Sequence, residues 1–334
     1  MTQASSRCDP EAVRRFCLKN FLPLGFLGAL IVALSWPEAG IKVSEPEVGD
    51  FRLVQTINVI TIFVISGLTL KTDDVVKAFS KEGRAAYGYG TLSILVITAC
   101  FGFIAVEIPF AVDEFSYGLA VFCVVPTTLT SGVALVVQGG GNGALALLLV
   151  VTTNLLGVIT VPLWVKAVLG AGGASIDAVD LLVKLVISVL VPLVIGKVIR
   201  ETAPGIKPLI TNHKVKLSLV SNFSLILVVW QSLSRAEEDL TSTSFVNILA
   251  VVAAGVILHL AFLAVNWPLA SRVLRLEPAQ FKAVVILTSQ KTLPVSVTVI
   301  GYLTAIGSEG LMTIPCIVGH MAQLFMDAYI VGRW

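Results

Sequence analysis

Ten long apolar runs are the feature of this sequence that most constrains its fold. A helix needs about 20 apolar residues to cross the ~30 Å hydrocarbon core of a bilayer. The chain offers candidates at 21–37, 51–70, 84–106, 115–138, 143–166, 178–199, 216–233, 244–270, 280–304 and 309–331. Charged residues make up only 13% of the sequence, against about 25% in soluble domains. The runs lack the two-residue alternation of barrel strands, so the sequence predicts an all-α, multi-pass protein of the lipid bilayer.

The basic residues are distributed unevenly between the connections. Seventeen of the 23 Lys and Arg residues lie in the N-terminal segment, in the connections after even-numbered runs, and at the C-terminus. The connections after odd-numbered runs are rich in Asp and Glu. Basic connections favour the cytoplasmic or equivalent side of a membrane, so both chain ends are expected on that side, here called the basic face. The opposite side is called the acidic face. The net charge of +2 indicates no nucleic-acid partner, and the sequence indicates no oligomeric state.

Ten spans divide into two groups of five, residues 21–170 and 178–334, after a soluble segment at 1–20. Because five is odd, the second group starts on the opposite side of the membrane, and a repeat would be inverted, as in many secondary transporters. An inverted repeat predicts that a helix interrupted in one half has a counterpart at the same place in the other. Residues 71–83, between the second and third spans, are expected to form a short amphipathic helix at the interface.

The fourth and ninth spans, the fourth of each half, both contain a proline beside a polar cluster. Proline removes a backbone donor, and the backbone groups that it frees cannot face lipid. A simple proline kink is the alternative, but two breaks at matched places favour a binding site. The residues concerned are Pro126, Thr127, Thr128, Thr130 and Ser131 in the fourth span, and Ser289, Gln290, Lys291, Thr292 and Pro294 in the ninth.

Lys291 is the most informative single residue. A charged side chain in mid-membrane costs at least about 2.5–3.5 kcal/mol on insertion scales, so Lys291 needs a partner. It would hold an anionic ligand, occupy the position of a cation, or bond the free carbonyls of the opposite broken helix. The hydroxyl and amide groups around it would supply oxygen ligands to Na⁺ or substrate, or else bond to helix backbone.

Polar residues on the fifth and tenth spans are expected to face this site. Asn154 is too deep in its span to cap it and would present an amide to the site or to another helix. His320, Gln323 and Asp327 share one helix face and would form a proton relay, a site wall or a hydrogen-bonded cluster. An ion pair between Asp327 and Lys291 is one hypothesis. Outside this group, packing is the default role for Gln55, Asn58, Ser66 and His259.

Six strings in the chain carry a family resemblance: VISGLTLKTDD (64–74), PTTLTSGVAL (126–135), GGNGALALLLVVTTNLLGVITVPLWV (140–165), VPLVIGKVIRE (191–201), SQKTLPVSV (289–297) and GHMAQLFMD (319–327). With them the sequence resembles the bile acid:sodium symporter superfamily, and within it the sodium/metabolite cotransporters of plant chloroplasts. The resemblance implies ten helices in two inverted five-helix repeats. Helices four and nine would be unwound and cross in a core domain, beside a panel of helices one, two, six and seven.

The resemblance also implies a function. It implies a sodium-coupled carrier of organic anions that works by alternating access, with sodium ligands at the fourth-span break, the fifth span and the ninth-span break, here Ser131, Asn154 and Gln290. It suggests the plastid envelope as the membrane; another organelle or the cell membrane is the alternative. Na⁺ is the only bound species implied besides the substrate, and no cofactor is expected.

The chain departs from the bile-acid members at three positions. Ile286 stands where they have glutamate, Lys291 where they have asparagine, and Gly132 where they have asparagine after a serine. A lost carboxylate and a gained ammonium both weaken a cation site, so Lys291 would replace one sodium ion in a proton-coupled carrier or a uniporter.

The sequence and the resemblance together therefore predict a sodium-coupled secondary transporter of a small anionic metabolite. A non-transporting regulator of cation influx is the alternative from another class. No catalytic residues are expected, since the sequence shows neither a nucleophile–base pair nor a metal cluster.

Overall fold

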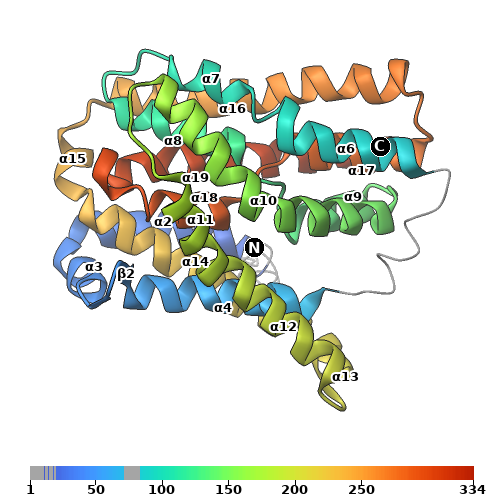
Figure 1. The fold of residues 1–334 in the computed structure, drawn as a ribbon, viewed down its shortest axis with the longest axis horizontal. Coiled ribbons are helices and arrows are strands. Elements are labelled where there is room, and N and C mark those ends of the chain that lie inside the picture. The colour runs from blue at the N-terminus through green and yellow to red at the C-terminus, as the bar shows by residue number, and fades with distance from the viewer. Residues whose placement is uncertain (1–10, 12–13, 15–17, 19, 71–82) are drawn as a thin grey trace, which may run out of the picture.

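The computed structural model describes residues 11, 14, 18, 20–70 and 83–334 (Figure 1). The expected soluble segment at 1–20 and the expected interfacial helix at 71–83 lie almost wholly outside these residues. The described part is helical apart from its connections and one short hairpin, in which β1 (Glu47–Val48) pairs antiparallel with β2 (Phe51–Arg52).

Helices occupy each of the ten expected ranges. The first half contains α2 (Phe21–Ser35), α3 (Pro37–Ser44), α4 (Leu53–Thr69), α6 (Arg84–Leu92), η2 (Ser93–Ile97), α7 (Phe101–Val106), α8 (Asp113–Val124), α9 (Ser131–Gln138) and α10 (Gly143–Ala171). The second half contains α11 (Ala178–Leu185), η3 (Val186–Leu190), α12 (Val191–Thr202), α13 (Ile206–Asn212), α14 (Lys214–Arg235), α15 (Glu237–Ser242), α16 (Phe245–Pro268), η4 (Leu269–Val273), α17 (Pro278–Ser289), α18 (Leu293–Ile300), η5 (Thr304–Ile306) and α19 (Glu309–Val331).

Seven of these helical segments, counted over the described residues, are long and apolar enough to cross a membrane. They run over 84–106, 143–171, 178–202, 214–235, 245–273, 278–300 and 309–331. An eighth is added if α2 and α3, which meet at a 99° bend, form one span. The chain is therefore an all-α, multi-pass membrane protein. The ten-span inverted repeat stays a prediction, because α4 is only 17 residues long and the 115–138 range is divided between α8 and α9.

The connections lie at the two ends of the helix bundle. In Figure 1, α3, the β1–β2 hairpin and α15 lie at the left end, whereas α9 and the 274–277 connection lie at the right end. The left end carries the connections that are rich in Asp and Glu and is the acidic face; the right end is the basic face.

The helices sort into two packing groups. In the first group, α4 packs on α12 and on α14, and α14 packs on α2. In the second, α19 packs on α8 and α16, and α17 packs on α10 and α16. The closest approach in the first group is between α4 and α12: a Cβ on Gly67 would meet the carbonyl of Leu193, and a Cβ on Gly196 would meet that of Val64. The two groups meet where α14 contacts α19 and where α10 contacts α11, which leads through η3 into α12; α18 adds smaller contacts with α4 and α14.

Two helices are broken where the prolines predict it. Residues 125–130 separate α8 from α9, and Gln290–Thr292 separate α17 from α18 in extended backbone. Pro294 lies in the first turn of α18, where a missing backbone donor costs nothing. The two breaks touch, because the Thr292 N–H donates to the Pro126 carbonyl oxygen at 2.9 Å.

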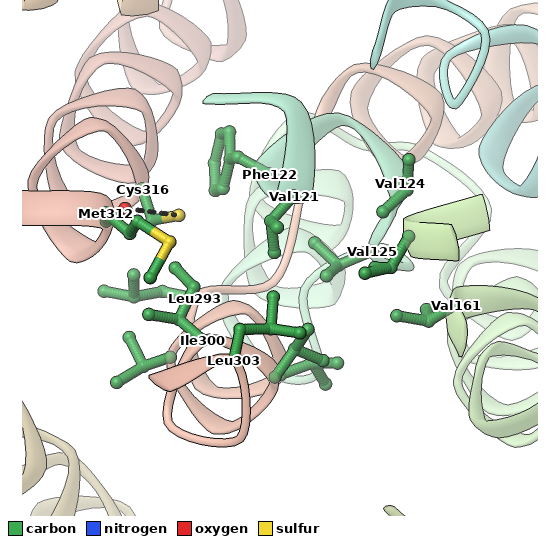
Figure 2. Close-up of a cluster of buried hydrophobic side chains, with 14 of the residues drawn as sticks. Val121, Phe122, Val124, Val125, Val161, Leu293, Ile300, Leu303, Met312 and Cys316 are labelled. Carbon is green, nitrogen blue, oxygen red and sulfur yellow. Dashed lines mark hydrogen bonds between the residues drawn. The ribbon is translucent and has the colours of Figure 1, made fainter. Parts of the chain in front are cut away.

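A buried apolar cluster holds the ends of both broken helices. Figure 2 shows Val121 and Phe122 of α8 beside Leu293 and Ile300 of α18, with Met312 of α19 closing the cluster. All five side chains are at most 2% exposed. Apolar packing on this scale fixes the backbone of both breaks, so the polar groups between them are held in place.

Candidate functional site

Lys291 lies in the ninth-span break, is fully buried, and extends its side chain to the fourth-span break. Its Nζ donates to the Val125 carbonyl oxygen at 2.9 Å, in the first break, and to the Ile94 carbonyl oxygen at 3.1 Å, in the π-helical turn η2. The ammonium also stands 5.7 Å from the centre of the Phe262 ring, within reach of a cation–π contact. Of the expected roles, the structure shows the bonding of a free carbonyl on the opposite broken helix, that of Val125, and adds the Ile94 carbonyl of η2.

The predicted ion pair between Lys291 and Asp327 is not formed. Asp327 Oδ1 lies 2.9 Å from His259 Nε2, and its Oδ2 accepts from Gln290 Nε2 at 2.7 Å. The ammonium and the carboxylate take different partners because Lys291 points toward α8 and η2, whereas Gln290 points toward α19. Asp327 is thus coupled to the ninth-span break through the neighbour of Lys291.

The expected polar face of α19 does meet this break. Gln323 accepts from the Lys291 N–H at 2.8 Å and donates to the Lys291 carbonyl at 2.7 Å, which satisfies both backbone polar groups of Lys291. His320 Nδ1 lies 3.3 Å from the same carbonyl. His320, Gln323 and Asp327 therefore all face the ninth-span break from one side of α19.

Gln290 links the two breaks through its side chain. Its Oε1 accepts from Thr128 Oγ1 at 2.7 Å, and Thr128 Oγ1 in turn accepts from the Gly132 N–H at 3.0 Å, in the first turn of α9. A Cβ on Gly132 would come within 2.6 Å of Thr128 Oγ1 and 2.9 Å of Gln290 Oε1, so a larger residue would displace these side chains. Glycine at this position therefore leaves space for the contact between them.

His259 belongs to the site, although the sequence gives it a packing role. Its Nδ1 lies 3.1 Å from the Ser289 carbonyl oxygen, which can only accept, and its Nε2 faces Asp327. If both contacts are hydrogen bonds, Nδ1 carries a proton and the His259–Asp327 pair shares a second one. A lone histidine in an apolar helix gave no sequence signal of this pairing, because its partner is 68 residues away.

Three buried oxygen atoms around the breaks have no hydrogen-bond partner. They are Thr127 Oγ1, Asn154 Oδ1 and Thr292 Oγ1. The Asn154 amide nitrogen donates to the Thr127 carbonyl at 3.0 Å, which places Asn154 at the first break. A buried oxygen without a protein partner can bind an ordered water or an ion, and hydroxyl and amide oxygens suit a hard cation such as Na⁺. Ser289, by contrast, bonds to its own helix through its hydroxyl, at 2.7 Å from the Val285 carbonyl.

A cavity of about 610 Å³ reaches the breaks from the basic face and is named cavity A. Thr128, Ser131 and Thr292 line its floor, together with the more exposed Thr130, while α4 and α14 form the opposite wall. None of the described residues that line it is Lys, Arg, Asp or Glu. Its size suits a small organic molecule.

A second cavity, of about 360 Å³, opens at the acidic face and is named cavity B. Cavities A and B follow the same interface between α4 and α18. On α4, Val59 lines cavity B and Ile62 lines cavity A; on α18, Thr298 lines cavity B and Pro294 lines cavity A. Three or four residues are about one helical turn, or ~5 Å of rise. The barrier between the cavities is therefore about one turn thick.

The comparison with known families decides the class of this protein. A model of the SBF-like CPA transporter family matches residues 20–334. The chain belongs to the SBF-like CPA transporter family. This family membership agrees with the resemblance seen in the six sequence strings, and it makes the chain a member of a transporter family.

Curated relatives of this SBF-like transporter cover nearly all of it. The chain is 36% identical over 328 residues to the probable sodium/metabolite cotransporter BASS4, chloroplastic, of Arabidopsis thaliana, covering 96% of this chain and 73% of the relative. It is 37% identical to the protein of the same name from Oryza sativa subsp. indica, over 99% of this chain and 79% of the relative. The sodium/bile acid cotransporter 7 of Rattus norvegicus is 25% identical, over 94% and 92%.

Proposed function

We propose that this chain is a secondary carrier that moves a small organic anion together with Na⁺ by alternating access. The observation that supports it best is the pair of touching helix breaks between two cavities that open at opposite faces. Alternating access then requires only that the one-turn barrier between Val59 and Ile62 open toward cavity B while cavity A closes toward the basic face.

The inverted repeat and the two-domain division fit the same proposal. The breaks lie in the fourth expected span of each half, and each is followed by an eight-residue helix, α9 or α18. The group of α2, α4, α12 and α14 would be the panel, and the group containing α8, α16, α17 and α19 would be the core. The core carries every polar contact between the breaks, so it would move as a unit against the panel.

The lack of charged side chains among the described residues that line cavity A supports coupling to a cation. An anion that enters a site without charged walls loses its hydration and gains no counter-charge. Na⁺ held by Thr127, Asn154 and Thr292 would supply that charge beside the floor of the cavity. Lys291 would act as a permanently tethered cation between the Val125 and Ile94 carbonyls, so one mobile Na⁺ per substrate is the proposed stoichiometry.

The names of the relatives supply the remaining parts of the proposal. The plant relatives are named as chloroplastic sodium/metabolite cotransporters, which makes a small metabolite the proposed substrate and the plastid envelope the proposed membrane.

Reconstituted uptake tests this function. The protein would be placed in liposomes with an inward Na⁺ gradient or an equal choline gradient, and accumulation of a panel of radiolabelled small carboxylates would be measured. We expect Na⁺-dependent accumulation of at least one of them. Thr292→Val should abolish it and Thr298→Val, on the other side of the barrier, should retain it. Absence of accumulation under every gradient would leave the regulator of cation influx as the better function.

A proton-coupled carrier is the second candidate, and the His259–Asp327 pair favours it. This pair reaches Gln290 directly, so a change in its protonation would alter the link between the breaks. Uptake driven by an inward proton gradient in Na⁺-free buffer would favour this candidate over sodium coupling.

A further inference from the structure

Glu309, in the first turn of α19, forms the most heavily bonded carboxylate of the described residues. Its side chain is 4% exposed. Oε1 accepts from Gln55 Nε2 at 2.9 Å and from Ser232 Oγ at 2.8 Å. Oε2 accepts from Arg235 Nη2 at 2.5 Å and from Arg52 Nη1. Arg235 also donates to Gln55 at 3.3 Å. These five residues are named the Glu309 cluster.

The Glu309 cluster joins the two packing groups. Glu309 comes from α19, whereas its partners come from α4 and α14 of the panel group and from β2, which leads directly into α4. The backbones also approach closely here, because a Cβ on Gly310 would meet Ala236 and the Ser232 carbonyl. A buried carboxylate with two arginines is strongly held, since removing one partner leaves an uncompensated buried charge.

The location of the cluster gives it a mechanical role. Arg52 and Gln55 line cavity B, so the cluster lies at the acidic face. Along α14, Ser232 binds Glu309, whereas Asn222, ten residues or about 15 Å away, lines cavity A. Along α19, Glu309 is in the cluster, whereas Leu324 lines cavity A. Helices α14 and α19 are therefore pinned together at the acidic face and separated by a cavity toward the basic face.

We propose that the Glu309 cluster is an ion-pair latch between the two packing groups, and that releasing it deepens cavity B from the acidic face and closes cavity A. The proposal rests on the alternating access proposed above, but it concerns the residues that set the balance between the two conformations. Because the carboxylate is shared, loss of Arg52 leaves Glu309 paired with Arg235 and weakens the latch, whereas loss of the Glu309 charge releases it.

Cysteine accessibility tests the latch without a substrate. Thr298→Cys reports on cavity B and Ser221→Cys on cavity A. Each would be combined with Glu309→Gln, and its rate of labelling by a hydrophilic maleimide measured in nanodiscs. We expect labelling at position 298 to rise about tenfold, the population change that 1.4 kcal/mol produces, and labelling at position 221 to fall. Arg52→Gln should shift both rates in the same direction by less.

The control is Glu238→Gln, which removes an exposed acid from the same face without touching the latch. Buried Cys123 serves as an internal reporter, because it is labelled only if the protein unfolds. If Glu309→Gln unfolds the protein and exposes Cys123, the test uses Arg52→Gln instead. The Arg52 side chain is partly exposed and lines cavity B, so its loss should disturb the fold less. Unchanged rates at both positions in a folded variant would overturn the latch. Uptake by the parent protein in liposomes is measured separately and does not depend on the labelling rates. Failure of the latch and failure of the transport function are therefore distinguishable results.

Discussion

Replacing Lys291 tests whether its ammonium occupies the position of a cation. Lys291→Met removes the charge but keeps most of the length and volume of the side chain, whereas Lys291→Ala empties that space. Both variants leave the Ile94 and Val125 carbonyls without the donor that now lies 3.1 and 2.9 Å away. Only the alanine variant leaves room for an ion between them.

The expected magnitudes follow from these contacts. Two hydrogen bonds from a charged donor are worth about 3–6 kcal/mol together. Removing the buried charge restores about 3 kcal/mol of stability, the cost of placing an ammonium in mid-membrane on insertion scales. The methionine variant should therefore lose about 0–3 kcal/mol of stability. In the alanine variant, Na⁺ at ten times its Kd should restore about 1.4 kcal/mol.

The assay is thermal unfolding of the purified protein in detergent, with NaCl exchanged for choline chloride at constant ionic strength. We expect the Na⁺-dependent stabilisation to be larger in Lys291→Ala than in the parent and in Lys291→Met. Lys216→Ala, which removes an exposed lysine, is the matched control and should match the parent. Equal responses to Na⁺ in the alanine and methionine variants would refute the idea that the ammonium replaces a cation.

Three further predictions concern packing, sodium affinity and the buried pair. Gly67→Ala should destabilise the protein strongly in thermal unfolding, because its Cβ would strike helix backbone, whereas Gly28→Ala should not, since nothing lies within 4 Å of that position; equal losses would contradict the close α4–α12 contact. Thr292→Val should leave thermal stability within about 0.5 kcal/mol of the parent, as for substitutions that break no partner, yet weaken Na⁺-dependent stabilisation severalfold; an unchanged Na⁺ response would exclude its oxygen as a ligand. Asp327→Asn and His259→Gln should each destabilise, with a coupling energy of about 0.5–3 kcal/mol in a double-mutant cycle; additive losses would mean that the pair is not energetically linked.

Much of the fold followed from patterns that are local in sequence. The ten apolar ranges all contain helices because the length of an apolar run is set by bilayer thickness, which no tertiary contact can change. The breaks were predictable because a proline stands beside a polar cluster at the same place in each half, whereas Pro162 and Pro315 lie inside continuous helices. The inward face of α19 followed from helical spacing, since residues three and four apart share a side wherever the helix packs.

The partners of the buried charges could not be predicted in the same way. The sequence suggested an ion pair between Lys291 and Asp327. In the structure Lys291 bonds to backbone carbonyls, and Asp327 bonds to His259 and Gln290. Gln55, expected only to pack, lies in the Glu309 cluster, whose members are separated by up to 257 residues. Nothing local distinguishes a glutamate that begins a helix in solvent from one that is buried against two arginines.

By itself the sequence determined that the chain crosses a membrane several times and that two of its helices break beside polar residues. These properties depend on single runs and single turns of the chain. Only the tertiary structure decided which buried charge meets which partner, and that the two cavities lie one turn apart. Those contacts depend on how distant helices pack, and packing chooses among many partners of equal chemistry by shape and distance alone.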